Sequence, residues 1–302
     1  MSRTGILIFT LLAWLGTGVA GFAAPLRVAA TTGMVGDLVR QVGGSEISLE
    51  VLMGPGVDPH LYKATASDVV TLRRADVIFY NGLLLEGKMT EVFERMAKQK
   101  ERVHAITEEL PRDRLLGSQD YAGHPDPHVW FDVDLWSQCL PLIQRRLTEA
   151  RPEKAAVFAA NAAAARERLA ALHAWAQETA RSLPAAQRVL VTSHDAYNYF
   201  GRAYGFEVIG LQGISTVTEA ALSDMARLTD LIRERGIKAI FVESSVSHGT
   251  IERISADTGV KIGGELFSDA MGTPGEMENG YDLGTYEGMI RHNLTTIRNG
   301  LR

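Results

Sequence analysis

The sequence contains very little cysteine, because Cys139 is the only one in 302 residues. A single cysteine cannot form a disulfide within the chain, so the fold must be held together by a hydrophobic core. The segment from Leu135 to Leu147 around it is apolar with a helical pattern, which predicts a buried thiol. A hydrophobic content of 46% is ordinary for a globular protein with such a core.

Positive charge is not in excess either. The chain has 31 Lys and Arg against 36 Asp and Glu, which gives a net charge of -5 at pH 7. Nucleic acid binding needs a basic surface, so this balance argues against a nucleic acid partner. A mildly acidic surface is compatible with a cationic ligand.

Long hydrophobic runs are absent apart from one at the N-terminus. Arg3 precedes the apolar stretch from Ile6 to Trp14, and small residues follow up to Ala23. This order is typical of a secretory signal peptide, and the apolar stretch is too short to span a membrane. We therefore predict a signal peptide at 1–23, cleaved after Ala23, and a mature protein in a bacterial periplasm. No cysteine lies near the cleavage position, so we expect no lipid anchor.

The longest segment without an internal Gly or Pro runs from Pro152 to Leu183. Its apolar and small residues recur at steps of three and four, which predicts one amphipathic helix. The residues expected on its buried face are Phe158, Ala162, Ala165, Leu169, Leu172, Ala176 and Thr179. Such a helix spans roughly 45 Å, longer than a typical domain is wide, and could bridge two lobes. A helix inside one domain or a coiled coil is the alternative.

Short apolar strands alternate with helical segments on both sides of this helix. The expected strands are Leu26 to Ala30, Ile47 to Met53, Asp76 to Tyr80 and Arg102 to Ile106, then Arg188 to Thr192, Phe206 to Gly210, Lys238 to Val242 and Val260 to Leu266. This alternation predicts βαβ units and parallel sheets. We therefore predict an α/β fold of two four-stranded parallel-sheet lobes, at 24–150 and 185–302, joined by one long rigid helix at 151–184.

Three of the eight histidines fall near the carboxyl ends of these strands, where parallel sheets bind ligands. His60 follows the second strand, His128 precedes a helix and His194 follows the fifth strand, while Asp269 follows the last strand. Three imidazoles and one carboxylate would form a compact shell for zinc or a similar divalent metal ion. A single histidine in a loop is more often a surface or hydrogen-bonding residue, and the spacing alone leaves that alternative open.

The tripeptide Asp-Pro-His occurs twice, at Asp58 to His60 and at Asp126 to His128. Each copy would present an imidazole from a rigid turn. Carboxylates commonly orient metal-binding imidazoles through the other ring nitrogen. We consider Asp132 and Asp195 as candidates for that role, and Glu243 either as a further carboxylate behind the ligands or as a structural one.

Five motifs together resemble one known family. They are MGPGVDPHLYKATASD, HVWFD, SHDAYNYFGRAYG, FVESS and LFSDAMG. These motifs are similar to those of the cluster 9 (A-I) substrate-binding proteins of zinc and manganese ABC importers, and GPGVDPHLY resembles the treponemal branch of that family. The resemblance extends over nearly all of the mature chain. It implies two α/β lobes joined by a rigid helix, and it identifies His60, His128, His194 and Asp269 as the four metal ligands.

The resemblance also implies a function. It predicts a periplasmic high-affinity receptor that binds one zinc ion per chain, with manganese as a possible ligand, and delivers it to an ABC permease in the inner membrane. We expect a monomer without catalytic activity. Members that prefer manganese often carry Glu where this chain has His194, and a nitrogen-rich shell favours zinc. His124 is the only histidine between residues 110 and 127, so we expect no His-rich metal-trapping loop. His124 could still pass ions to the site.

Two other functions fit part of the pattern. A secreted zinc hydrolase also uses about three protein ligands, but the sequence has no His-Glu-x-x-His motif, and Asp269 would fill the position that the reactive water needs. A metal-binding adhesin or chaperone without a permease partner also remains open at this point, because nothing in one chain identifies a permease.

Overall fold

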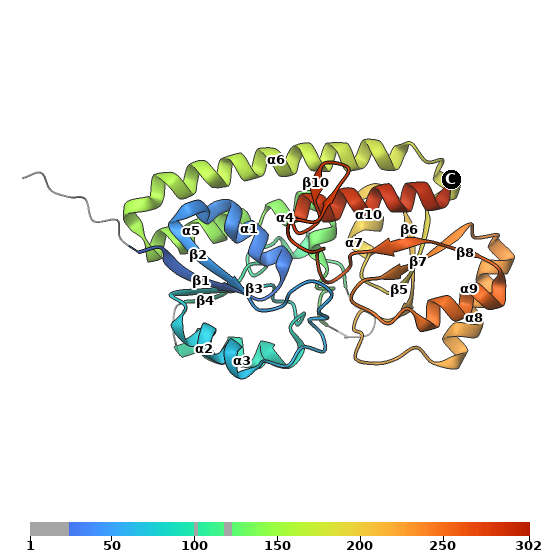
Figure 1. Cartoon of the computed structure of the whole chain (residues 1–302), viewed down its shortest axis with the longest axis horizontal. Coiled ribbons are helices and arrows are strands. Elements are labelled where there is room, and N and C mark those ends of the chain that lie inside the picture. Colours follow the sequence, from blue (N-terminus) through green and yellow to red (C-terminus); the bar gives the residue numbers. More distant parts are fainter. Residues whose placement is uncertain (1–23, 100–101, 118–122) are drawn as a thin grey trace, which may run out of the picture.

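The computed structural model describes residues 24–99, 102–117 and 123–302 of the chain. The signal peptide predicted at 1–23 lies outside these residues. Two α/β lobes lie side by side, and one long helix runs along both of them (Figure 1). Within the described ranges, no helix is both long and apolar enough to cross a membrane.

The N-terminal lobe contains one parallel sheet of four strands in the order β2-β1-β3-β4. The strands are β1 (Leu26–Ala30), β2 (Ile47–Val51), β3 (Val77–Tyr80) and β4 (Val103–Ala105). Helix α1 (Gly33–Gly43) lies on one side of the sheet, and α2 (Ala66–Arg74) and α3 (Thr90–Gln99) lie on the other (Figure 1). This confirms the predicted parallel α/β arrangement of the first half.

Polar side chains begin two of these helices. The Thr32 hydroxyl accepts a hydrogen bond from the Val35 amide at the start of α1. At the start of α2, Thr65 and Asp68 form a reciprocal capping box. Such caps satisfy amide groups that have no partner inside the helix, so they determine where the chain changes from loop to helix. The loop from β2 to α2 therefore has a defined end, which matters because it carries His60.

The C-terminal lobe also contains four parallel strands, but they pair as β5–β6 and β7–β8. The strands are β5 (Val189–His194), β6 (Glu207–Gln212), β7 (Ala239–Glu243) and β8 (Lys261–Leu266). The helices are α7 (Asn198–Tyr204), α8 (Leu222–Arg235), α9 (Gly249–Thr258) and α10 (Tyr286–Leu301), and a small hairpin joins β9 (Met277–Glu278) to β10 (Tyr281–Asp282). Strands β5 and β7 pack side by side, although no backbone ladder joins them within the described chain. The predicted second sheet thus consists of two adjacent parallel pairs.

The long helix α6 (Ala155–Arg181) has 27 residues and follows the shorter helices α4 (Val133–Ser137) and α5 (Leu140–Ala150). Its buried residues include all seven that the sequence pattern predicted, together with Ala180. The predicted helix began at Pro152, but Pro152–Lys154 forms a 3₁₀ turn that precedes the α-helix. Helix α6 packs against α1 and α5 of the N-terminal lobe, against α7 and α10 of the C-terminal lobe, and against α4, which confirms the predicted bridging position.

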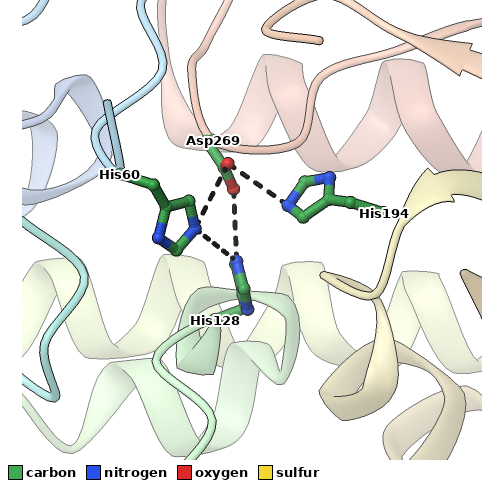
Figure 2. Close-up of side chains that lie close together, drawn as sticks. All are labelled: His60, His128, His194 and Asp269. Carbon is green, nitrogen blue, oxygen red and sulfur yellow. Dashed lines mark hydrogen bonds and ion pairs between the residues drawn. The ribbon is translucent and has the colours of Figure 1, made fainter. Parts of the chain in front are cut away.

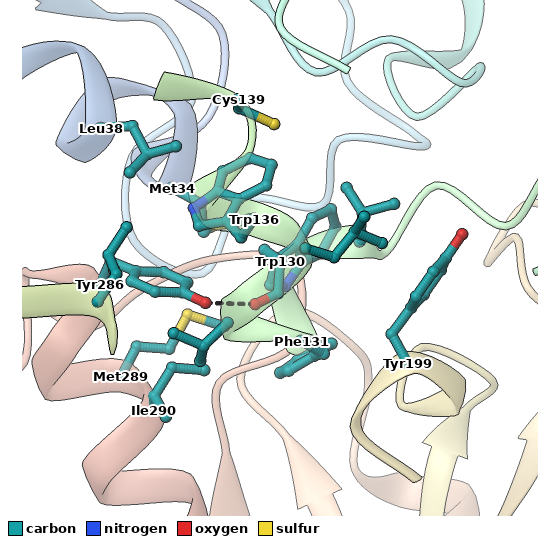
Figure 3. Packing of buried hydrophobic residues seen from close by; sticks show 14 of the residues in the cluster. Met34, Leu38, Trp130, Phe131, Trp136, Cys139, Tyr199, Tyr286, Met289 and Ile290 are labelled. Atoms are coloured by element: carbon teal, nitrogen blue, oxygen red, sulfur yellow. Dashed lines mark hydrogen bonds between the residues drawn. The ribbon is translucent and has the colours of Figure 1, made fainter. Parts of the chain in front are cut away.

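One hydrophobic core continues through the junction of the lobes (Figure 3). Trp130 and Trp136 come from the segment before α5, and Tyr286 comes from the start of α10. The Tyr286 hydroxyl donates a hydrogen bond to the Trp130 carbonyl at 2.5 Å. Cys139 is fully buried in the same core, as predicted, and burial raises the pKa of its thiol. Because interiors are packed closely, this shared core restricts how far one lobe can rotate against the other.

Candidate metal centre

Four side chains meet where the two lobes face each other (Figure 2). His60, His128, His194 and Asp269 each offer one donor atom, and these atoms all lie within 4.8 Å of one another. The His194 Nε2 lies 3.2 Å from one Asp269 carboxylate oxygen, and the His128 Nε2 lies 3.4 Å from the other. The His60 Nε2 lies 3.3 Å from the His128 Nε2 and 3.7 Å from the Asp269 Oδ2. The structure thus brings together the four residues that the sequence predicted.

The fold explains why these four side chains lie close together. His60 lies in the loop between β2 and α2, and His128 lies directly before the 3₁₀ turn Val129–Phe131. His194 is the last residue of β5, which runs two residues further than the strand predicted to end at Thr192, and Asp269 follows β8. The carboxyl ends of parallel strands open toward the same edge of a sheet, so loops from both lobes converge at their junction. Two residues come from each side of α6.

The cluster is almost completely removed from solvent. His128 and His194 are 0% exposed, Asp269 is 1% exposed and His60 is 7% exposed. Within the described chain, the His194 Nε2 and both Asp269 carboxylate oxygens make no hydrogen bond. Buried polar atoms without a partner are costly, and buried charges are normally paired or coordinate a metal ion. Three imidazole nitrogens and one carboxylate aimed at one point fit a divalent cation.

The neighbours shift the proton affinities of the cluster in different directions. Burial, reinforced by the nearby imidazoles, lowers the pKa of His60 to about 3, so its ring stays neutral at ordinary pH. Burial opposes a charge on His194, but the carboxylates of Glu243 and Asp269 raise the pKa of His194 well above its usual value. Burial alone would raise the pKa of Asp269, but the three imidazoles lower it. Asp269 is therefore ionised and attractive to a cation.

Two of the imidazoles are oriented by carboxylates behind them. The His128 Nδ1 lies 2.7 Å from the Asp126 Oδ1, which also accepts the His128 amide at 2.9 Å. The His194 Nδ1 lies 2.5 Å from the Glu243 Oε2. A carboxylate can only accept, so each Nδ1 carries the proton and donates it, which leaves Nε2 as the donor atom for a metal ion. Glu243 therefore has the orienting position that the sequence suggested.

The other two carboxylates suggested for this role lie elsewhere. The Asp132 Oδ1 accepts the Leu135 amide at the start of α4, and its Oδ2 pairs with Arg114 and Arg202. The Asp195 side chain is held by Asn198 and acts on His128 and His194 only through its charge. Sequence reasoning missed Asp126, although the repeated Asp-Pro-His motif could have identified it, because both copies place Asp two residues before His.

Trp130 and His124 both lie near the cluster without belonging to it. The Trp130 ring centroid lies 5.2 Å from that of His128, and its Nε1 donates to the Ser268 carbonyl at 3.1 Å. Trp130 thus packs against His128 and holds the residue next to Asp269. His124 is exposed and, together with His60, lines a cleft of about 200 Å³, but it does not belong to the four-residue cluster.

Comparison with known proteins gives the same family throughout. The family described as zinc-uptake complex component A, periplasmic, matches residues 28–300. The chain is 46% identical over 275 residues to the zinc-binding protein TroA of Treponema pallidum, which covers 89% of this chain and 87% of that protein. It is 44% identical over 294 residues to the manganese-binding lipoprotein MntA of Bacillus subtilis, which covers 95% of this chain and 94% of that protein.

Solved structures agree with the sequence comparison. The periplasmic zinc-binding protein TroA from Treponema pallidum superimposes with a TM-score of 0.86 at 45% identity, over 92% of this chain and 99% of that chain. The family match, these relatives and the shared fold all extend over both lobes and the helix between them. The resemblance seen in the sequence motifs is thereby confirmed, and the chain belongs to the family of periplasmic zinc-uptake components, the substrate-binding proteins of metal ABC importers.

Proposed function

We propose that this protein is a periplasmic receptor that captures one divalent metal ion between its lobes and delivers it to an ABC permease. The observation that carries this proposal is the buried convergence of three histidines and one aspartate within 4.8 Å. The ion is the cargo, and His60, His128, His194 and Asp269 are its proposed ligands. The protein itself catalyses no reaction in this proposal.

Zinc is the proposed cargo, with manganese as the alternative. The relatives do not decide between them, because proteins named for zinc and for manganese are 46% and 44% identical to this chain. The donor set supports zinc, since three imidazole nitrogens suit zinc better than manganese, which prefers oxygen ligands. A fourth protein ligand, Asp269, also distinguishes the site from a catalytic zinc centre, which keeps a position open for water.

The remaining parts of the proposal concern export, organisation and delivery. We propose that residues 1–23 are a signal peptide removed after Ala23, and that the mature chain is a monomer. Its proposed units are an N-terminal lobe at 24–150, a linking helix at 151–184 and a C-terminal lobe at 185–302. The partner would be the permease subunit of an importer in the inner membrane, consistent with the role of the family.

Metal analysis and calorimetric titration of the metal-free protein test the proposal. We expect one zinc ion per chain in the wild type, and binding that is lost or strongly weakened in His194→Ala. His124→Ala removes an imidazole from the cleft but not from the cluster, so it serves as the matched control and should bind like the wild type. Wild-type protein that bound neither zinc nor manganese, or a His194→Ala variant with unchanged affinity, would refute the proposed site.

A further inference from the structure

The three candidate histidines are held in different ways. The rings of His128 and His194 are each fixed by a carboxylate at Nδ1. Across the part of the chain that the structure describes, no carboxylate holds the His60 Nδ1. Asp58 reaches only the His60 backbone amide, which donates to the Asp58 Oδ1 at 2.8 Å. The position of His60 therefore depends on its loop and not on a carboxylate at Nδ1.

A hydrogen bond links the loop that carries His60 to the C-terminal lobe. The Thr216 hydroxyl donates a hydrogen bond to the second carboxylate oxygen of Asp58, Oδ2, at 2.5 Å. Thr216 lies between β6 and α8 of the C-terminal lobe, whereas Asp58 lies between β2 and α2 of the N-terminal lobe. Thr216 is 7% exposed, so water competes little for this hydrogen bond. One hydroxyl thus links the C-terminal lobe to the turn that presents His60.

A cleft opens directly beside this link. It has a volume of about 200 Å³, and among the four proposed ligands only His60 lines it. Its other walls come from both lobes and include Leu83, Leu84 and Val217. Val217 is the neighbour of Thr216 and is 61% exposed. Ser215 and Val217, the chain neighbours of Thr216, thus line the same cleft as His60.

The wall of the cleft formed by the N-terminal lobe has an unusual backbone. Leu83 and Leu84 adopt φ values of 54° and 66°, a left-handed conformation that is unfavourable for leucine. The buried Glu86 carboxylate holds this turn by accepting the amides of Asn81 and Gly82. This wall is braced from within its own lobe, whereas the turn that carries His60 is linked to the other lobe through Asp58 and Thr216.

We propose that Thr216 is a positioning residue for His60, and that its hydrogen bond to Asp58 keeps the ion from leaving through this cleft. The inference rests on the proposed function. When the hydrogen bond breaks, the Asp58 turn can carry His60 away from the other ligands, while His128 and His194 stay in place because Asp126 and Glu243 hold them. His60 is then the first ligand to leave the ion and the last to close on it.

The rate of zinc release tests this inference. Zinc-loaded full-length mature protein is mixed with an excess of chelator in a stopped-flow instrument. Thr216→Val keeps the shape of the side chain but removes the donor, and we expect release to be faster by about tenfold or more, as for the loss of one hydrogen bond to a carboxylate. Thr216→Ser keeps the hydroxyl and should release zinc at a rate close to that of the wild type.

Two further variants separate positioning from general destabilisation. Thr216→Ala removes the same donor without adding a methyl group in place of the hydroxyl, and should match Thr216→Val. Thr71→Val removes another threonine-to-carboxylate hydrogen bond, from the Thr71 hydroxyl to the Glu50 Oε2 at 2.7 Å, at an exposed place outside the site. Its release rate should equal that of the wild type.

The possible failures can be told apart. If the wild type binds zinc but Thr216→Val and Thr216→Ala release it at the wild-type rate, the inference is wrong and the proposed function stands. The inference is also wrong if Thr216→Ser releases zinc as fast as Thr216→Val. If the wild type binds neither zinc nor manganese, the proposed function fails and the inference fails with it.

Discussion

Glu243 holds His194 at two points. Its Oε1 accepts the His194 backbone amide at 2.9 Å, and its Oε2 lies 2.5 Å from the His194 Nδ1. The two residues end neighbouring strands, β7 and β5, which pack side by side without a backbone ladder between them. One carboxylate therefore connects the two strand pairs of the C-terminal lobe and also sets the tautomer and direction of a proposed metal ligand.

Replacing this carboxylate by an amide should weaken metal binding. In Glu243→Gln the side-chain oxygen can still accept the His194 amide, but its NH₂ group then faces Nδ1. The ring must turn Nδ1 into an acceptor and place its proton on Nε2, where the metal ion should bind. We expect the affinity for zinc to fall about 10- to 100-fold, as for other changes of this kind. Titration against a competing chelator measures this loss.

The surface pair of Glu207 and Arg235 supplies the control for that experiment. Glu207→Gln makes the same chemical change in the same lobe, on a residue that pairs with an exposed arginine outside the site. Its zinc affinity should equal that of the wild type. An unchanged affinity in Glu243→Gln would show that the carboxylate has no role in orienting the ligand.

Metal binding should release a proton and weaken as the pH falls. The carboxylates around His194 raise its pKa above the usual 6.5. In the metal-free protein the ring therefore carries a proton on Nε2 as well as on Nδ1, and zinc must displace the proton on Nε2. His60, with a pKa of about 3, is already neutral and adds no proton in the same range. Lower pH favours the protonated, metal-free state, and therefore the affinity decreases from neutral pH downward.

Calorimetry in buffers of different ionisation enthalpy measures this proton. The apparent binding enthalpy should change with the buffer, with a slope of about one proton per ion near neutral pH. Binding enthalpies that do not depend on the buffer would contradict a protonated His194 in the metal-free protein.

A methyl group at Gly87 should disturb His60 directly. Gly87 has φ of 48°, and a Cβ atom added there would lie 2.7 Å from the His60 carbonyl oxygen. Gly87→Ala should therefore lower both the free energy of unfolding, by about 1 kcal/mol or more, and the zinc affinity. Urea denaturation and chelator competition measure the two effects.

Gly236 offers a matched control, because its φ is 60° but no atom lies within 4 Å of an added Cβ. Gly236→Ala should lose stability from the backbone strain alone and keep its zinc affinity. Equal zinc affinities in the two glycine variants would mean that the turn at Gly87 does not support the site.

A proline in the middle of α6 should separate the two halves of the site. Ala165 is fully buried and lies near the centre of the helix. Ala165→Pro should cost about 3 kcal/mol of stability and, because two proposed ligands lie on each side of α6, should also reduce the zinc affinity. Ala163→Gly, on the exposed face, should cost about 1 kcal/mol and leave binding unchanged. Wild-type affinity in a folded Ala165→Pro protein would make α6 a simple connector.

Much of the fold was readable from local patterns. The alternation of short apolar strands and helices predicted the α/β class, and the three- and four-residue steps in α6 predicted its buried face residue by residue. The positions of three histidines and Asp269 relative to the predicted strands suggested a site, and the family resemblance identified the same four residues, which meet in space. The buried face could be predicted because the spacing of apolar side chains reflects which face of a helix or strand is buried. The meeting of the loops could be predicted because parallel strands present their carboxyl ends on one side of the sheet.

Other relationships depended on the tertiary structure. Asp126, and not Asp132, orients His128, because the first lies in the turn while the second begins a helix and pairs with two arginines. The link from Thr216 to Asp58 joins residues 158 positions apart, and no periodicity in the chain relates them. The sequence by itself thus determined which side chains are buried and which motifs carry donors. Only the tertiary structure decided which loops meet and which polar atoms become partners, because those contacts depend on how two separately patterned lobes pack against one helix.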